Sequence, residues 1–398
     1  MANVISGDAE AIAVAAGLGR RFAAGDADRD ARRILPRDLV DELSESGLLA
    51  ITVPREHGGA GVTARTLGEV FTELSAGDAS LGQLPQNHFF FVNVLAQAGS
   101  AEQRRFFYAE VLGGKRFGNA LSERGSRDAH DFRIGFTPQP GGGYLLDGIK
   151  YYSTGSVYAH WIPVYANDPD GRLHAAWVRP GDPGVEVVDD WDGMGQRTTG
   201  SGTVRFSQVR VPAFHVVPAY RIFQQTETFG AFGQYLHACV DLGIAVAALR
   251  DGKELIRTTA RPWWEAGVDR AADEPAVIEK FGELALLVRA ARALVRAAGD
   301  ALDAADPECP GGALTEETSA EASAAVAAAR AQADTAAVTV SSDVFALIGS
   351  RAAQAELNLH RHWRNARTHT LHDPRRWKVR HLGDWELNDV PPPRNGIV

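Results

Sequence analysis

Two histidines and one acidic residue lie close together near the C-terminus, in the run from Arg364 to Pro374. If this segment is helical as far as Pro374, His369 and His372 are three residues apart and share a face, which Asp373 can also reach. Proline disfavours the helical conformation at the residue before it, so the helix is expected to end at Asp373 and to leave the group at an exposed rim. Imidazole changes charge near neutral pH, and a carboxylate can fix its tautomer. These residue types at this spacing are suited to moving protons.

The histidines can also be ordinary solvated or hydrogen-bonded residues of a helix, because only some clusters of titratable residues mark functional sites. Two histidines and one aspartate, with no third ligand nearby in the sequence, do not indicate a metal site, and none is expected. The surrounding segment from His360 to His381 holds seven Arg/Lys, five His and one acidic residue. It is interpreted either as a solvated basic face or as a local site for an anion such as phosphate.

The size and composition of the chain limit the number of domains and the class of protein in which this group can lie. With 398 residues, the chain is longer than one hydrophobic core usually supports, so two or three domains are expected. Its 45% hydrophobic and 23% charged residues are typical of a soluble globular protein. The net charge of −9 argues against general affinity for nucleic acid, which needs a basic surface.

The cysteines and the apolar runs bear on the cellular compartment. Cys239 and Cys309 are far apart and form no Cys-x-x-Cys pattern, so neither a disulfide framework nor a zinc site is indicated. The N-terminus lacks the pattern of a signal peptide, and no uninterrupted apolar run reaches membrane-spanning length. We therefore expect a cytoplasmic protein with no membrane contact.

The pattern of elements changes twice along the chain. Helical spacing of apolar residues is typical of residues 1–115, and short β-prone runs separated by Gly, Pro and Asp-Gly turns are typical of residues 116–220. Residues 221–398 are helical again and rich in alanine. This pattern predicts an α+β protein with an N-terminal helical domain, a central antiparallel β domain and a C-terminal helical bundle. The long bundle helices are expected near residues 229–259, 275–305 and 315–348.

Four motifs in this order resemble the acyl-CoA dehydrogenase family. Pro54 to Gly61 resembles its P-x-E-x-G-G-x-G loop, and Asn119 to Ser126 resembles its T-E-x-x-G-S segment beside the flavin. Gly148 to Gly155 resembles G-x-K-x-x-I-T-N, and Val204 to Pro212 resembles the F-x-x-V-x-V-P end of the β domain. The resemblance covers nearly the whole chain and implies the acyl-CoA dehydrogenase fold, with a four-helix bundle at the C-terminus and the flavin between the domains.

The resemblance leaves two reactions open. A dehydrogenase of this family needs a carboxylate base, and Asp373 stands at the family's base position, although it is shorter than Glu and is followed by Pro. The alternative base position holds Gly233 with no Glu beside it. A misplaced base costs on the order of 100-fold in rate, so a dehydrogenase with Asp373 as base is the second hypothesis.

The first hypothesis follows from three segments that resemble the flavin monooxygenases of this fold, including the dibenzothiophene desulfurization monooxygenases and the sulfur-acquisition oxidoreductases that act on sulfones. The segments are Arg367 to Pro374, Arg261 to Gly267, and Trp377 to Arg394. The resemblance implies a two-component monooxygenase that receives reduced FMN from a separate NAD(P)H-dependent reductase. Oxygen then forms a flavin 4a-hydroperoxide, which oxygenates a small organosulfur compound. An N-oxygenase of an amine on the same scaffold is a further alternative, and a non-catalytic protein that binds a partner through residues 360–381 is a third class.

The resemblance also implies roles for catalytic residues. His372 would lie beside flavin carbon 4a and hydrogen-bond the peroxide, while His369 and Asp373 would orient it or contact the substrate. His88 would approach the same pocket from the N-terminal domain.

Cofactor contacts are implied in the same way. Ser153 or Thr154 would lie near flavin nitrogen 5, and Asn119 and Ser122 would line the isoalloxazine ring.

Two arginines are implied at the flavin phosphate. Arg261 falls at the family position that meets the phosphate across a subunit interface, and Arg351 is a second candidate. The segment Phe345 to Arg351 lacks the Gln and the second Gly of the FAD-binding relatives, which favours FMN over FAD. The family resemblance also implies a homotetramer built from the C-terminal bundles.

Overall fold

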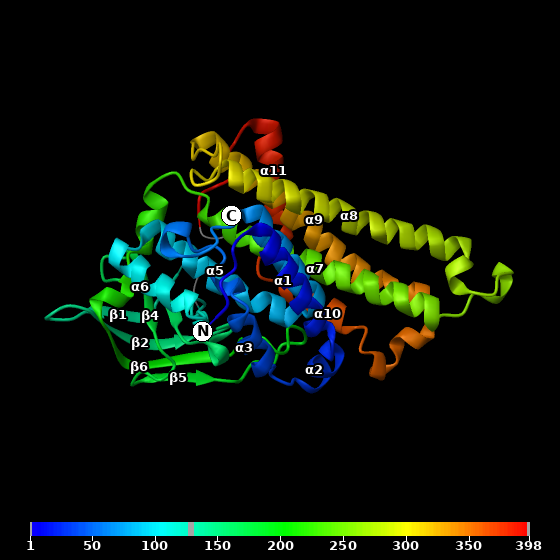
Figure 1. Cartoon of the computed structure of the whole chain (residues 1–398), viewed down its shortest axis with the longest axis horizontal. Coiled ribbons are helices and arrows are strands. Elements are labelled where there is room, and N and C mark those ends of the chain that lie inside the picture. Colours follow the sequence, from blue (N-terminus) through cyan, green and yellow to red (C-terminus); the bar gives the residue numbers. More distant parts are fainter. Residues whose placement is uncertain (1, 126–130, 396–398) are drawn as a thin grey trace.

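The computed structural model describes residues 2–125 and 131–395, so Ser126 of the second motif lies outside the described residues. Helices α1 to α6 come first, strands β1 to β7 follow, and helices α7 to α11 complete the chain. Figure 1 shows the strands gathered at one end of the molecule and the long helices α7, α8 and α9 side by side at the other. The predicted order of helical, β and helical parts is confirmed.

The N-terminal helices are started by side-chain caps where the sequence offers them. Thr63 caps α4, Asp78 caps α5, and Ser100 forms a capping box with Gln103 at the start of α6. The motif loop from Pro54 to Gly61 contains a single 3-10 turn, Arg55–His57, and is closed by glycines. The helices are α1 (Asp8–Ala23), α2 (Asp26–Arg32), α3 (Arg37–Glu45), α4 (Ala64–Gly77), α5 (Ala79–Ala98) and α6 (Ala101–Leu112).

The strands form two antiparallel sheets. One sheet has the order β1-β2-β6-β5 and the other the order β3-β4-β7. The β-prone runs expected within residues 116–220 correspond to β2, β3, β4 and β6, whereas β1, β5 and β7 are too short to stand out. The strands are β1 (Gly135–Pro138), β2 (Tyr144–Lys150), β3 (Ile162–Asn167), β4 (Leu173–Val178), β5 (Val185–Val188), β6 (Thr203–Val211) and β7 (Val216–Val217).

The C-terminal part is built on three long helices that lie within one residue of the predicted ranges. Helix α7 lies at the centre, where it contacts α4, α5, α8 and α9. It is long and apolar enough to cross a membrane, but 83% of its most apolar window is buried in the protein, as in a core helix. The helices are α7 (Phe229–Thr258), α8 (Pro275–Ala304), α9 (Glu316–Ile348), α10 (Arg361–His369) and α11 (Arg375–Asn388).

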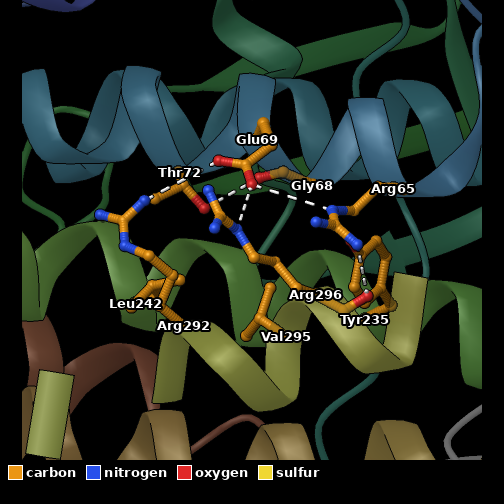
Figure 2. A pocket seen from close by; sticks show the side chains of 9 residues that line it. All are labelled: Arg65, Gly68, Glu69, Thr72, Tyr235, Leu242, Arg292, Val295 and Arg296. Carbon is orange, nitrogen blue, oxygen red and sulfur yellow. Dashed lines mark hydrogen bonds and ion pairs between the residues drawn. The ribbon is translucent and has the colours of Figure 1, made fainter. Parts of the chain in front are cut away.

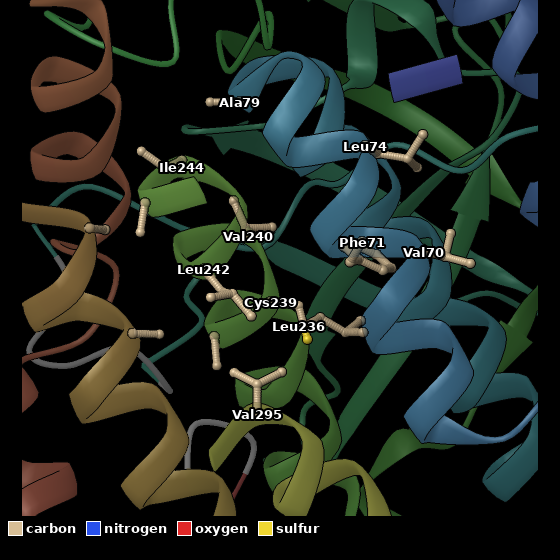
Figure 3. Close-up of a cluster of buried hydrophobic side chains, with 14 of the residues drawn as sticks. Val70, Phe71, Leu74, Ala79, Leu236, Cys239, Val240, Leu242, Ile244 and Val295 are labelled. Carbon is tan, nitrogen blue, oxygen red and sulfur yellow. The ribbon is translucent and has the colours of Figure 1, made fainter. Parts of the chain in front are cut away.

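The core between α4 and α7 is apolar and closely packed. Figure 3 shows Val70, Phe71 and Leu74 on α4, beside the helix α7 that carries Leu236 and Val240 of the same buried cluster. All five side chains are buried. Removing such side chains from water contributes about 1.5–3 kcal/mol each, so α7 is held firmly in position.

The seam between α4 and α8 is polar at the surface. A small hollow there contains Glu69, which is surrounded by Arg65, Arg292 and Arg296 (Figure 2). The Nε of Arg296 donates to Glu69 at 2.7 Å, and Arg65 also pairs with Asp300. These partly exposed pairs link α4 to α8 at the surface of the bundle.

Candidate functional site

Helix α10, which lies at the start of the segment from His360 to His381, is fixed by buried ion pairs. The guanidinium of Arg361 contacts Asp26 of α2 and Asp251 of α7, each at 2.6 Å. Arg364 pairs with Asp30, also of α2. These arginines are therefore anchors of the helix, and the expectation of a solvated basic face or an anion site is wrong for both of them.

The helix ends earlier than the sequence predicted. The last helical residue of α10 is His369, residues 370–373 form a turn, and α11 starts at Arg375. The Nδ1–H of His372 donates to the carbonyl of His369 at 2.6 Å, and the backbone N–H of His372 donates to the same carbonyl at 3.2 Å, so both bonds close a turn there. His369 and His372 therefore meet across a turn, with ring centroids 4.9 Å apart, and not along a helix face.

A third histidine, which the sequence analysis missed, completes the group. His237 of α7 places its Nδ1 3.0 Å from the Nε2 of His369, and its ring centroid is 4.8 Å from that of His372. One turn further along α7, Asp241 lies 2.6 Å from the Nδ1 of His369. The available signal was the spacing of His237 and Asp241, which puts an imidazole and a carboxylate on one face of a helix.

The hydrogen bonds determine which ring nitrogens carry protons. Asp241 is also paired with the buried Arg330 of α9, which keeps the carboxylate charged. The Nδ1–H of His369 then donates to Asp241, and the Nε2 of His369 accepts from the Nδ1–H of His237. Burial, reinforced by the nearby ring of His372, lowers the pKa of His237 and His369 well below the ordinary value, so both rings are neutral.

Two glutamines line the same group. The amide nitrogen of Gln83, on α5, lies 3.3 Å from the Nε2 of His372, and that of Gln234, on α7, donates to Asp373 at 2.8 Å. The Oε1 atoms of both glutamines are buried and have no hydrogen-bond partner among the described residues. Asp373 was expected to reach the same helix face as His369, but the turn directs it to Gln234, and Asp241 is the carboxylate that holds His369.

His88 is on the same helix as Gln83 but makes different contacts. Its Nε2–H donates to the carbonyl of Leu49 at 2.8 Å, and its Nδ1 accepts from the N–H of Phe117 at 3.0 Å. Burial lowers the pKa of His88 to about 4. Both of its nitrogens are thus occupied by the backbone, and Gln83 is the α5 residue that touches the histidine group.

Asn119 and Ser153 offer free polar atoms from two neighbouring segments. Both contact Ser156, whose Oγ donates to the carbonyl of Asn119 at 2.8 Å and whose N–H donates to the carbonyl of Ser153 at 3.1 Å. The Oδ1 of Asn119 and the Oγ of Ser153 are buried without a hydrogen-bond partner among the described residues. Such orphaned atoms suit the polar edge of a flavin ring.

Thr154 and Ser122 are placed differently. The Oγ1 of Thr154 is bonded to Ser201 at 2.7 Å, so its hydroxyl is already used. Ser122 is exposed, and its carbonyl accepts from the N–H of Tyr151 at 2.9 Å.

The two candidate phosphate-binding arginines lie near each other but far from the histidines. Arg351 donates to the carbonyl of Thr259 at 2.6 Å, and Arg261 follows two residues later, exposed to solvent. From His237, the helix rises for about 30 Å before it ends at Thr258. FMN is shorter than this, so the arginines of one chain do not reach a flavin held beside the histidines of the same chain.

Comparison with known proteins matches the two helical parts of the chain separately. Residues 13–115 match the N-terminal domain model of the acyl-CoA dehydrogenases, and residues 235–375 match their C-terminal domain model. Dibenzothiophene monooxygenase of Rhodococcus qingshengii is 34% identical over 96% of this chain and 94% of its own. The probable FMNH2-dependent monooxygenase SfnC of Pseudomonas putida is 28% identical over 96% of each chain.

A solved structure agrees with these matches. FMN-bound TdsC of Paenibacillus sp. A11-2 superimposes with a TM-score of 0.90 and 32% identity, over 98% of this chain and 100% of that chain. The predicted fold is confirmed.

Proposed function

We propose that this chain, which belongs to the acyl-CoA dehydrogenase family and within it to the flavin-dependent monooxygenases, uses reduced FMN and oxygen to oxygenate a small organosulfur compound. The observation that carries the proposal is the buried chain from Asp241 through His369 to His237, which lies against His372. The chemical class of the substrate rests on the relatives named for dibenzothiophene.

The residues present fit FMN. We assign the orphaned Oδ1 of Asn119 and Oγ of Ser153 to the flavin ring, since each needs a partner that the described residues do not supply. Thr154 would contribute its backbone N–H, because its hydroxyl is bonded to Ser201. When bound, reduced FMN supplies the electrons that activate oxygen.

The histidine group would manage the protons of the reaction. One oxygen atom goes to the substrate and the other leaves as water, so protons must reach the leaving oxygen. His372 would hydrogen-bond at that position through its Nε2, because its Nδ1–H is fixed on the carbonyl of His369. His237 and His369 would pass a proton along their 3.0 Å contact, with the charge balanced at Asp241.

A homotetramer is part of the proposal, because the phosphate-binding arginine must come from another chain. Arg351 or Arg261 of the partner subunit would meet the phosphate. Exposed apolar side chains on α8 and α11 offer surfaces for such contacts, among them Ile278, Leu286, Trp377 and Leu387. We further propose a cytoplasmic protein that receives reduced FMN from a separate NAD(P)H-dependent reductase.

The test supplies reduced FMN, ¹⁸O₂ and a panel of dibenzothiophene, dialkyl sulfides and sulfones. The expected result is a sulfur product that gains one ¹⁸O atom only when reduced FMN is present. Consumption of oxygen to hydrogen peroxide with every sulfur compound would contradict the proposal. A panel of amines and a panel of acyl-CoA compounds are run in parallel. Oxygenation of an amine would indicate the N-oxygenase, and oxidation of an acyl-CoA would indicate the dehydrogenase with Asp373 as base.

A further inference from the structure

Three imidazoles meet in one place although the sequence brings only two of them together. His237, His369 and His372 each offer a ring nitrogen, and these atoms lie within 4.8 Å of one another. Imidazole nitrogen is a ligand of divalent ions such as Zn²⁺, Cu²⁺ and Ni²⁺. We propose that His237, His369 and His372 form a binding site for a divalent transition-metal ion, with Zn²⁺ as the reference ion.

The spacing of the nitrogens is close to what such an ion requires. The Nδ1 of His237 and the Nε2 of His369 are 3.0 Å apart. Two nitrogens at 2.0–2.1 Å from a tetrahedral zinc ion are about 3.3 Å apart, so these two need to separate only slightly. His372 lies in the turn between α10 and α11, where its side chain can adjust without moving a helix.

Groups behind the rings already orient two of the three ligands. Histidine ligands of metals usually donate their second N–H to a carboxylate or a backbone carbonyl. The Nδ1 of His369 is 2.6 Å from Asp241, and the Nδ1–H of His372 donates to the carbonyl of His369 at 2.6 Å. Both rings therefore present an unprotonated Nε2 as the ligand atom.

The charges and the remaining donors around the rings are compatible with a bound cation. Arg330 and Lys378 are the nearby cations, and the carboxylates of Asp241 and Asp373 offset them. The amide nitrogen of Gln83 lies 3.3 Å from the Nε2 of His372, so exchanging the ends of this amide would present its unpartnered Oε1 to the site as an oxygen ligand. Three neutral nitrogens favour zinc-like ions over Mg²⁺ or Ca²⁺, which prefer oxygen ligands.

Metal binding and the proposed proton transfer exclude each other. A metal ion on the Nδ1 of His237 takes the position of the proton that His237 donates to His369. The site therefore gives zinc-like ions a route to block the histidine group, and its existence does not depend on the identity of the substrate.

The experiment measures Zn²⁺ binding to the flavin-free full-length protein by equilibrium dialysis, with no activity readout. We expect one Zn²⁺ per chain, bound at least 10-fold more weakly by His237→Gln and by His372→Gln, and unchanged in His381→Gln, a histidine of the same segment outside the group. Equal binding by all four proteins, or no stoichiometric binding, would overturn the proposal.

A second measurement, which does not use the His237 variant, guards against misfolding of that variant. Co²⁺ loaded in place of Zn²⁺ should give the intense visible bands of four-coordinate cobalt, and these should be lost in His372→Gln, a substitution in the turn between α10 and α11. Weak bands of octahedral cobalt would rule the site out. Because neither assay contains flavin or substrate, their outcome is separate from that of the oxygenation assay.

Discussion

At the scale of single residues, His372 differs from the other two histidines because its residue is exposed while its ring packs against theirs. Its Nε2 is contacted only by the amide of Gln83, at 3.3 Å, among the described residues. It is therefore the imidazole of the group best placed to meet a substrate.

His372→Ala should uncouple the reaction. Without the imidazole, the leaving oxygen lacks its hydrogen-bond partner, so we expect product formation to fall by about 100-fold while oxygen is still consumed and hydrogen peroxide accumulates. Product and peroxide are measured in the same reaction, with His381→Ala as control. Unchanged ratios of product to oxygen would remove His372 from the mechanism.

His88 makes stability depend on pH. Its pKa is lowered by burial from 6.5 to about 4, so the unfolded chain takes up the proton first as the pH falls, and the folded state loses stability between pH 6.5 and 4. His88→Gln lacks the titrating imidazole and therefore does not lose stability in this way. The difference in unfolding free energy between the two proteins should therefore shrink by about 1.4 kcal/mol from pH 7.5 to 5.5, measured by urea unfolding. A pH-independent difference would contradict this account.

At the scale of elements, the central position of α7 depends on its close approach to α4. Gly243 allows this approach, because a Cβ there would lie 2.4 Å from the Cβ of Ser75 and 2.9 Å from the backbone nitrogen of Ala76. The same helix carries His237 and Asp241, so its packing against α4 also positions the histidine group.

Gly243→Ala should lower the free energy of unfolding by about 1–3 kcal/mol, because helix backbone must move to admit the methyl group. Gly282→Ala on α8 is the matched control, since nothing lies within 4 Å of a Cβ there. The free energy of unfolding of that control should rise by about 0.5–1 kcal/mol, because alanine is a better helix former than glycine. Guanidinium unfolding at pH 7.5 measures both, and equal effects of the two changes would show that α4 and α7 have room at this point.

At the scale of the whole molecule, the distance along α7 separates the histidine group from the proposed phosphate-binding arginines within one chain. The histidines lie near its start, and Arg351 contacts Thr259 just beyond its end. Under the proposed function, a complete site would therefore be shared by two chains, as in symmetric oligomers whose interfaces carry function.

Mixing two inactive variants tests this arrangement. We expect His372→Ala and Arg351→Ala each to lack product formation alone, and we expect activity to return when the two are unfolded, mixed and refolded together. Mixed oligomers then contain sites with an intact histidine group from one chain and an intact arginine from the other. Absence of complementation, with oligomers formed normally, would place the arginine and the histidines of each site on one chain.

The sequence by itself determined the order of helical and β parts, the bounds of the long helices, and the family. These features rest on local signals, namely apolar periodicity, caps, turns and short motifs, which act over a few residues. His369, His372 and Asp373 were recognised from the sequence as a group because they lie within five residues of one another.

Only the tertiary structure decided how this group is built. Asp241 is 128 residues from His369, and Asp26 is 335 residues from Arg361, so no local pattern links them. The turn after His369 also replaced the last residues of the predicted helix, and the backbone N–H and the Nδ1–H of His372 both close this turn on the carbonyl of His369. Proton positions, buried charges and ligand sets depend on contacts between distant segments, and packing of α7 against its neighbours settles those contacts.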